Sequence, residues 1–209
     1  MSTMDTAEVL QLAPVIPVVA LDDAAQAVPL AQALLRGGIR TIEVTLRTPA
    51  AVDAIERIAG AVPEMVVGAG TITEPEQIKP AVAAGAQYLV TPGSTERLLD
   101  ALDSAGVPFL AGASTVSEAM RLAERGLSAM KFFPAEQSGG VGFLKAVAGP
   151  LPQLRFCPTG GINPQNAASY LALPNVGCVG GSWLAPKDLL AAGEWGRVEE
   201  LAREAASLR

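Results

Sequence analysis

The sequence predicts an α/β protein with a single domain, folded as a (β/α)8 barrel of the TIM type. Short apolar runs alternate with longer stretches rich in alanine and leucine, and the pair recurs eight times. Eight strand–helix units in about 200 residues are typical of a compact barrel of parallel strands. No linker or break in composition divides the 209 residues, so we expect one domain over residues 1–209.

The predicted strands are apolar runs too short to form helices of ordinary length. Their ends carry glycine, proline or polar residues, which favour turns. The strands are expected at residues 15–20, 39–46, 65–69, 87–90, 108–112, 129–133, 155–157 and 177–179.

The predicted helices fill the intervals between these strands. Pro49, Pro75 and Pro164 stand where a first helical turn tolerates proline, and glycine follows several of the stretches, as at many helix ends. Residues 4–12 are expected to form a further short helix that closes the barrel floor. The main helices are expected at residues 23–36, 49–61, 75–84, 96–105, 117–125, 142–148, 164–171 and 188–207.

The alternative architecture is a doubly wound open sheet. Such a sheet normally has fewer strands and opens with a glycine-rich turn after its first strand. Here the first predicted strand is followed by Leu21, Asp22 and Asp23. The barrel is therefore the favoured interpretation.

Composition and charge exclude several classes of function. Half of the residues are hydrophobic and 17% are charged, which argues against disorder. The net charge of −6, without a basic cluster, gives no sign of nucleic-acid binding. No signal peptide and no apolar run of membrane-spanning length is recognisable, so we expect a cytoplasmic protein without membrane contact.

The chain contains no histidine. Ser-His-Asp and Cys-His mechanisms are therefore excluded, and the commonest metal ligand is missing. Any proton transfer must use Glu, Asp, Lys, Tyr, Cys or water. Cys157 and Cys178 lie in predicted strands and are expected to be small core residues.

Lys131 is the main candidate nucleophile. It stands in the apolar run LSAMKFFP, residues 127–134, at the upper end of the sixth predicted strand. Burial favours a neutral amine, which can form a Schiff base with a carbonyl substrate. The alternative is that the long side chain reaches solvent from the strand end.

The second predicted strand carries two charges toward the lumen. Ile42, Val44 and Leu46 alternate with Glu43 and Arg47, and the apolar set should face the helices. Charges inside a barrel are expensive unless they are paired or functional. Either Glu43 and Arg47 form a structural ion pair, or Glu43 performs acid/base chemistry opposite the lysine and Arg47 binds an anion.

Two glycine-rich segments follow the last two predicted strands. They are CPTGGIN, residues 157–163, and VGGSW, residues 179–183. These two positions commonly form a phosphate site in (β/α)8 enzymes. Backbone N–H groups of glycines can approach phosphate oxygens, and Ser182 can donate its hydroxyl. We expect phosphate binding at this place.

Seven motifs follow one another along the chain in a fixed order. They are IEVTLRT (42–48), VGAGT (67–71), PG (92–93), ST (114–115), KFFPAE (131–136), FCPTGGI (156–162) and GGSW (180–183). Taken together, these motifs make the chain resemble the 2-keto-3-deoxy-6-phosphogluconate (KDPG) aldolase family, which includes enzymes that cleave 4-hydroxy-2-oxoglutarate (KHG). The resemblance covers about residues 15–203. One departure lies near the end of the fifth strand, where Ala111 and Ala113 flank Gly112 and family members often carry proline and a larger aliphatic residue.

The resemblance implies a class I aldolase that uses a Schiff base and neither metal nor cofactor. It cleaves KDPG to pyruvate and glyceraldehyde 3-phosphate, or acts mainly on KHG to give pyruvate and glyoxylate. Family members form homotrimers. The implied roles are imine formation for Lys131, acid/base catalysis for Glu43, carboxylate binding for Arg47 and Thr71, pocket walls for Pro92 and Phe133, and phosphate binding for Thr159, Gly160, Gly161, Gly181 and Ser182.

Two other classes of function stay open from the residues alone. One is a phosphate-binding barrel isomerase that forms no imine. The other is a sugar-phosphate-binding protein without catalytic activity.

Overall fold

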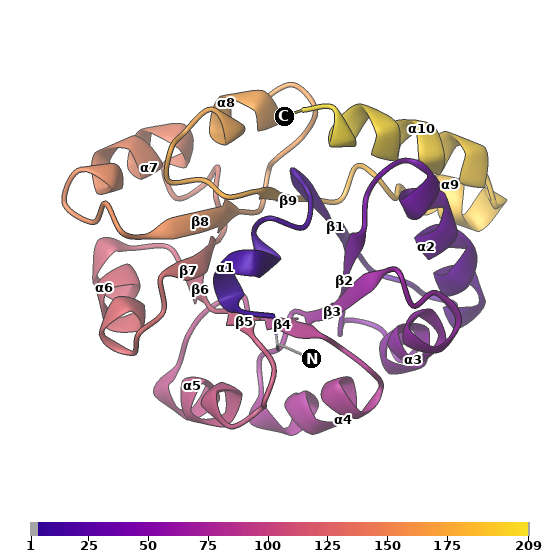
Figure 1. The fold of residues 1–209 in the computed structure, drawn as a ribbon, viewed down its shortest axis with the longest axis horizontal. Helices are drawn as coiled ribbons and strands as arrows, with labels where there is room; N and C mark the ends of the chain where they lie inside the picture. Colours follow the sequence, from indigo (N-terminus) through magenta and orange to yellow (C-terminus); the bar gives the residue numbers. More distant parts are fainter. Residues whose placement is uncertain (1–3, 209) are drawn as a thin grey trace.

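The computed structural model describes residues 4–208 and is an α/β fold built on parallel strands. The strands curl around a central axis, and helices surround them (Figure 1). This arrangement confirms the prediction of an α/β fold on parallel strands. The strands are β1 (Val15–Val19), β2 (Thr41–Thr45), β3 (Val66–Gly70), β4 (Tyr88–Val90), β5 (Phe109–Leu110), β6 (Gly112–Ala113), β7 (Ala129–Phe132), β8 (Arg155–Pro158) and β9 (Val179–Gly181).

The strands form two hydrogen-bonded sheets. Six of them follow the order β5-β4-β3-β2-β1-β9, and three follow the order β6-β7-β8. Two isolated parallel bridges join β8 to the region of β9: Phe156, within β8, pairs with Val176, and Thr159, just after β8, pairs with Gly180.

The fifth predicted strand is divided into β5 and β6. Pro92, in the loop after β4, lies against Gly112, where an added Cβ atom would stand 2.2 Å from its carbonyl oxygen. Between the two strands, the Ala111 carbonyl accepts a hydrogen bond of 3.0 Å from the Lys131 amide. The chain thus leaves its pairing with β4 at Leu110 and pairs with β7 from Gly112.

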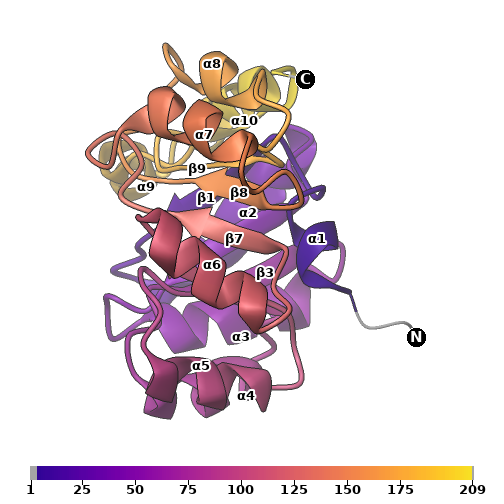
Figure 2. The same ribbon diagram turned by 90° about the vertical axis from the view of Figure 1, so that its left-hand side faces the viewer.

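The helices form the outer layer, as the two perpendicular views show (Figures 1 and 2). Most of them match the predicted stretches to within a few residues. They are α1 (Thr6–Val9), α2 (Ala27–Arg36), α3 (Ala51–Ala61), α4 (Ile78–Ala83), α5 (Glu96–Asp103), α6 (Val116–Glu124), α7 (Gly140–Ala148), α8 (Ala167–Leu171), α9 (Lys187–Ala192) and α10 (Trp195–Ala206), with short 3-10 turns η1 (Ala24–Gln26) and η2 (Pro75–Gln77) before α2 and α4.

The prediction of one helix over residues 188–207 is wrong. Gly193 adopts φ +68° and ends α9, and its N–H bonds to the Leu190 carbonyl. A left-handed glycine terminates a helix because the chain turns away from the helical axis there. The chain resumes as α10 at Trp195.

The short helix α1 lies at the amino ends of the strands (Figure 2). It is shorter than the predicted 4–12, and Asp5 and Glu8 form a capping box at its start. Val9 and Leu10 are buried in an apolar cluster with strand residues. That cluster also holds both cysteines, as predicted, and consists of Val9, Leu10, Ile16, Tyr88, Val90, Leu110, Ala129, Cys157 and Cys178.

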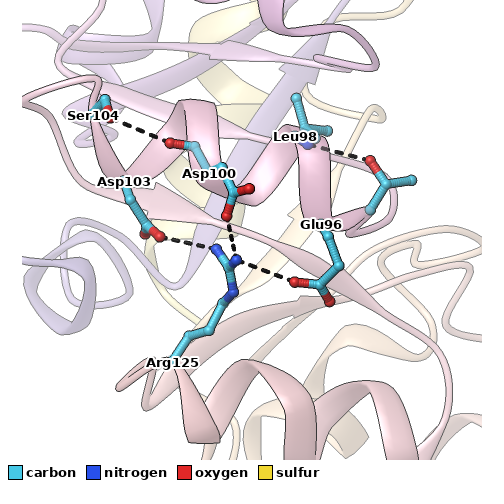
Figure 3. Close-up of polar contacts among 7 residues, drawn as sticks. Glu96, Leu98, Asp100, Asp103, Ser104 and Arg125 are labelled. Atoms are coloured by element: carbon cyan, nitrogen blue, oxygen red, sulfur yellow. Dashed lines mark hydrogen bonds and ion pairs between the residues drawn. The ribbon is translucent and has the colours of Figure 1, made fainter.

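Arg125, at the end of α6, joins this helix to α5 (Figure 3). Its guanidinium contacts Glu96 at 3.1 Å and Asp103 at 2.9 Å, and it also pairs with Asp100. The three carboxylates hold the pKa of Arg125 above its ordinary value, mainly through the hydrogen bond that the guanidinium donates to Asp100. The guanidinium therefore stays charged and ties two outer helices together.

No helix within residues 4–208 is both long enough and apolar enough to cross a membrane.

Candidate active site

Lys131 points into the lumen of the curled sheet. It lies on β7, and its side chain is 5% exposed. Its Nζ atom stands 3.3 Å from Oε1 of Glu43 and 5.4 Å from the centre of the Phe133 ring. The alternative in which the lysine reaches solvent is therefore wrong.

Glu43 reaches the same place from β2. Its neighbours Ile42 and Val44 are fully buried in the core on the helix side, so the predicted alternation of this strand is confirmed. The Glu43 side chain is 4% exposed. A carboxylate and an amine in contact, both withdrawn from water, can exchange a proton directly or through one water molecule.

Arg47 does not pair with Glu43. It is exposed at the mouth, and its Nε donates a hydrogen bond of 3.0 Å to the Thr45 hydroxyl. That hydroxyl in turn donates to the Val19 carbonyl. The structural Glu43–Arg47 pair considered from the sequence is thus not formed, and the guanidinium stays available to an anion near the mouth.

Three further candidates lie at the carboxyl ends of their strands and are half-buried: Thr71 after β3, Pro92 after β4 and Phe133 after β7. Thr71 has φ +58°, a left-handed conformation that a β-branched residue rarely adopts. This backbone conformation raises the energy of the folded state by about 1–3 kcal/mol and persists only where the surrounding structure requires it. Thr71 directly follows Gly70, whose Cβ position lies against the Glu43 carboxylate.

The first glycine-rich segment needs glycine for its backbone. Gly160 and Gly161 adopt φ +99° and +79°, which L side chains disfavour. The Thr159 and Gly160 carbonyls accept hydrogen bonds from the amides of Ala135 and Glu136, which follow β7. The loop is therefore fixed to the segment that carries Lys131.

The second segment needs glycine for a different reason. A Cβ atom on Gly180 would lie 2.3 Å from the Thr159 hydroxyl, and one on Gly181 would lie 1.8 Å from the Trp183 ring. These glycines make room for neighbouring side chains. The bridge between Thr159 and Gly180 brings the two segments side by side, with Ser182 exposed beyond them.

Sequence reasoning missed Tyr88. This residue is fully buried in the lumen, and its hydroxyl shares a hydrogen bond of 2.9 Å with the Thr41 hydroxyl. Burial, followed by the nearby charge of Glu43, raises the pKa of Tyr88 well above its ordinary value. The one available signal was that Thr41 shares the strand face of Glu43.

Thr115 caps a helix. It begins α6 in a capping box with Glu118, whose carboxylate accepts hydrogen bonds from the amides and hydroxyls of Ser114 and Thr115. Within residues 4–208, no group of three or more His, Cys, Asp or Glu side chains could hold a metal ion.

A family model described as KDPG and KHG aldolase matches residues 6–201. The chain is similar to the 2-dehydro-3-deoxy-phosphogluconate aldolase of Pseudoalteromonas atlantica, with 52% identity over 96% of this chain and 93% of the relative. It is similar to the KHG/KDPG aldolase of Escherichia coli, with 53% identity over 94% of this chain and 92% of the relative.

Two solved structures of KDPG aldolases are also similar to this chain. A KDPG aldolase from Legionella pneumophila, captured with pyruvate as a covalent carbinolamine, superposes with a TM-score of 0.95. It is 44% identical, with coverage of 98% of this chain and 99% of that one. A Zymomonas mobilis aldolase for 2-keto-3-deoxy-6-phosphogluconate has a TM-score of 0.92 and 42% identity, covering 99% of this chain and 98% of its own.

Proposed function

The chain belongs to the KDPG and KHG aldolase family, and we propose that it cleaves KDPG to pyruvate and glyceraldehyde 3-phosphate. The observation that carries the proposal is the buried contact of 3.3 Å between Lys131 Nζ and Glu43 Oε1. An amine held this way can attack a ketone, and the adjacent carboxyl group can donate and accept the protons that the reaction transfers. The carbinolamine captured in the Legionella enzyme supports covalent chemistry on an amine.

Imine formation comes first. The neutral amine of Lys131 attacks the C2 carbonyl of the substrate and gives a carbinolamine. Glu43, through a water molecule, protonates the departing hydroxyl group. Loss of water leaves a protonated imine, which withdraws electrons from the neighbouring C3–C4 bond.

Bond cleavage follows. The Glu43 carboxylate removes the proton of the C4 hydroxyl, and the C3–C4 electron pair moves into the imine. Glyceraldehyde 3-phosphate leaves, and the enamine of pyruvate stays attached to Lys131. Protonation of the enamine at C3 and hydrolysis of the imine release pyruvate and regenerate the amine.

The remaining candidates suit the two ends of this substrate. Arg47 and Thr71 lie at strand ends near the reacting pair and are proposed to hold the carboxylate. Pro92 and Phe133 are proposed as apolar walls. The phosphate is proposed to bind at the two adjoining glycine-rich segments, through Thr159, Gly160, Gly161, Gly181 and Ser182.

KHG is the second candidate substrate. The name of the Escherichia coli relative, KHG/KDPG aldolase, supports this second candidate. KHG has no phosphate, so it would use the lysine, the glutamate and the carboxylate site but would not need the phosphate site. The ratio of kcat/KM for the two substrates decides which of them is preferred.

The test is a borohydride trap. Purified protein incubated with pyruvate and borohydride should gain one covalent adduct, which peptide mapping should place on Lys131. Lys131→Met should give no adduct, whereas Lys145→Met, on α7, should be trapped normally. An adduct at another residue would contradict the assignment. Inactivity toward KDPG and KHG together would favour a binding protein, and turnover without trapping would favour chemistry that forms no imine.

Several expectations accompany this function. We propose that β5 and β6 act as one interrupted strand, so that the curled sheet forms a closed (β/α)8 barrel in one domain, and the bridges at Phe156 and Thr159 support this closure. The proposed chemistry needs neither metal nor cofactor. The homotrimer and the cytoplasmic location stay predictions.

A further inference from the structure

The lumen face of β3 carries no side chains at two successive levels. Gly68 and Gly70 occupy these positions, and side chains from the neighbouring strands fill the space. A Cβ atom built on Gly68 would lie 2.2 Å from the Tyr88 ring, which comes from β4. A Cβ atom built on Gly70 would lie 2.0 Å from Oε1 of Glu43, which comes from β2.

The two glycines differ in what a side chain would displace. At Gly68 the three nearest atoms all belong to the rigid ring of Tyr88. At Gly70 the three nearest atoms are Oε1, the carboxyl carbon and the γ carbon of Glu43, the flexible end of one side chain. Gly70 has no left-handed φ, so its backbone would accept alanine. An added methyl group at Gly70 must therefore move the Glu43 carboxylate.

Tyr88 limits where that carboxylate could go. Its ring fills the level of Gly68, one step closer to the amino ends of the strands, and its hydroxyl is held by Thr41. Burial and the Glu43 charge raise the pKa of Tyr88, so the phenol stays neutral and provides a fixed floor. A displaced carboxylate therefore cannot move toward the amino ends of the strands.

We propose that Gly70 is a positioning residue for the reaction, because the Glu43 carboxylate that faces Lys131 occupies the space that a Cβ atom at Gly70 would need. The proposal rests on the acid/base role of Glu43 given above. Acid/base catalysis needs the carboxylate within hydrogen-bond reach of its proton, and misplacement by about 1 Å can cost on the order of 10²-fold in rate.

The experiment is Gly70→Ala, measured for kcat, KM and Tm. We expect kcat to fall about 10²-fold, while KM and Tm change little, because the methyl group moves a carboxylate without straining the fold. Gly60→Ala is the matched control, since nothing lies within 4 Å of its Cβ position on α3, and it should keep normal kinetics. Gly68→Ala should instead lower Tm, because it meets a rigid ring.

A double variant that changes both Gly70 and Glu43 shows whether Gly70 acts by positioning Glu43 or only supports the fold. The double variant Gly70→Ala with Glu43→Gln should turn over no more slowly than Glu43→Gln alone, since the function of the carboxylate is already lost. Three results would each overturn the proposal. The first is a double variant whose kcat falls by the product of the two single losses, the second is a normal kcat in Gly70→Ala, and the third is a fall in the Tm of Gly70→Ala like that of Gly68→Ala. Normal turnover of Glu43→Gln would instead refute the proposed mechanism itself.

Discussion

Lys131 and Glu43 meet across the lumen although they are 88 positions apart in the sequence and lie on strands that are not neighbours. Glu43 is on β2, which pairs with β1 and β3, whereas Lys131 is on β7, which pairs with β6 and β8. A flat sheet would keep these side chains far apart. The curl of the strands is what brings the amine and the carboxylate to 3.3 Å.

Glu43→Gln should lower kcat about 10²–10⁴-fold, the usual contribution of a positioned acid/base group. The amide keeps the size of the side chain but cannot accept the C4 hydroxyl proton. Steady-state kinetics with KDPG measures the effect. Tm of the variant, compared with the parent protein, separates lost chemistry from lost folding.

Ser182→Ala should raise KM for KDPG more than for unphosphorylated KHG. The hydroxyl is exposed beside the adjoining glycine-rich segments, where we place the phosphate. Ser169→Ala, on α8, is a suitable control because its hydroxyl bonds within its own helical turn. Equal changes in KM for both substrates would argue against a phosphate contact at Ser182.

Treatment with a chelator should leave activity unchanged. The proposed chemistry runs through the Lys131 imine and the Glu43 carboxylate, so it needs no metal-bound water or Lewis acid. Dialysis against EDTA followed by an assay of KDPG cleavage is the measurement. Loss of activity that added Mg²⁺ or Zn²⁺ restores would show that the mechanism is incomplete.

Glu118→Ala should destabilise the protein near neutral pH by about 0.5–2 kcal/mol, the range for loss of a helix cap. Hydrogen bonds, first the one from the Ser114 amide, lower the pKa of Glu118 below its ordinary value of 4.5. Its stabilising contribution is therefore present above the unfolded pKa and lost as pH falls through the folded pKa.

Unfolding by denaturant at several pH values tests this sign. The difference between the parent protein and Glu118→Ala should shrink in acid below pH 4.5. A difference that stayed constant into strong acid would mean that the carboxylate charge does not matter to the cap.

Arg125→Met should lower Tm slightly at low salt, because it removes contacts to Glu96, Asp100 and Asp103 and leaves their charges close together. The difference from the parent protein should nearly vanish in about 1 M NaCl, where exposed charges are screened. Arg57→Met is a control with a single exposed partner, Asp53, and should have a smaller effect. Equal effects in low and high salt would assign the change in Tm to packing.

Periodicity predicted much of the candidate site because alternation is a local property. In β2 the apolar residues Ile42 and Val44 had to face the helices, so Glu43 had to face the lumen. The break between α9 and α10 was missed because Gly193 can sit in a helix as well as end one. The division between β5 and β6 was missed because it lies where Gly112 meets Pro92, a residue from another loop, and no local pattern reveals that contact.

The sequence by itself determined the parallel α/β class, the family and the inward direction of Glu43, since these follow from the order and spacing of residues along the chain. Whether Lys131 points into the lumen or reaches solvent was decided by the structure. The tertiary structure alone decided that Arg47 stays apart from Glu43, that Tyr88 fills the floor and that Gly70 makes room for a carboxylate. These are relations between strands. They depend on register and curl, which no single segment of sequence contains.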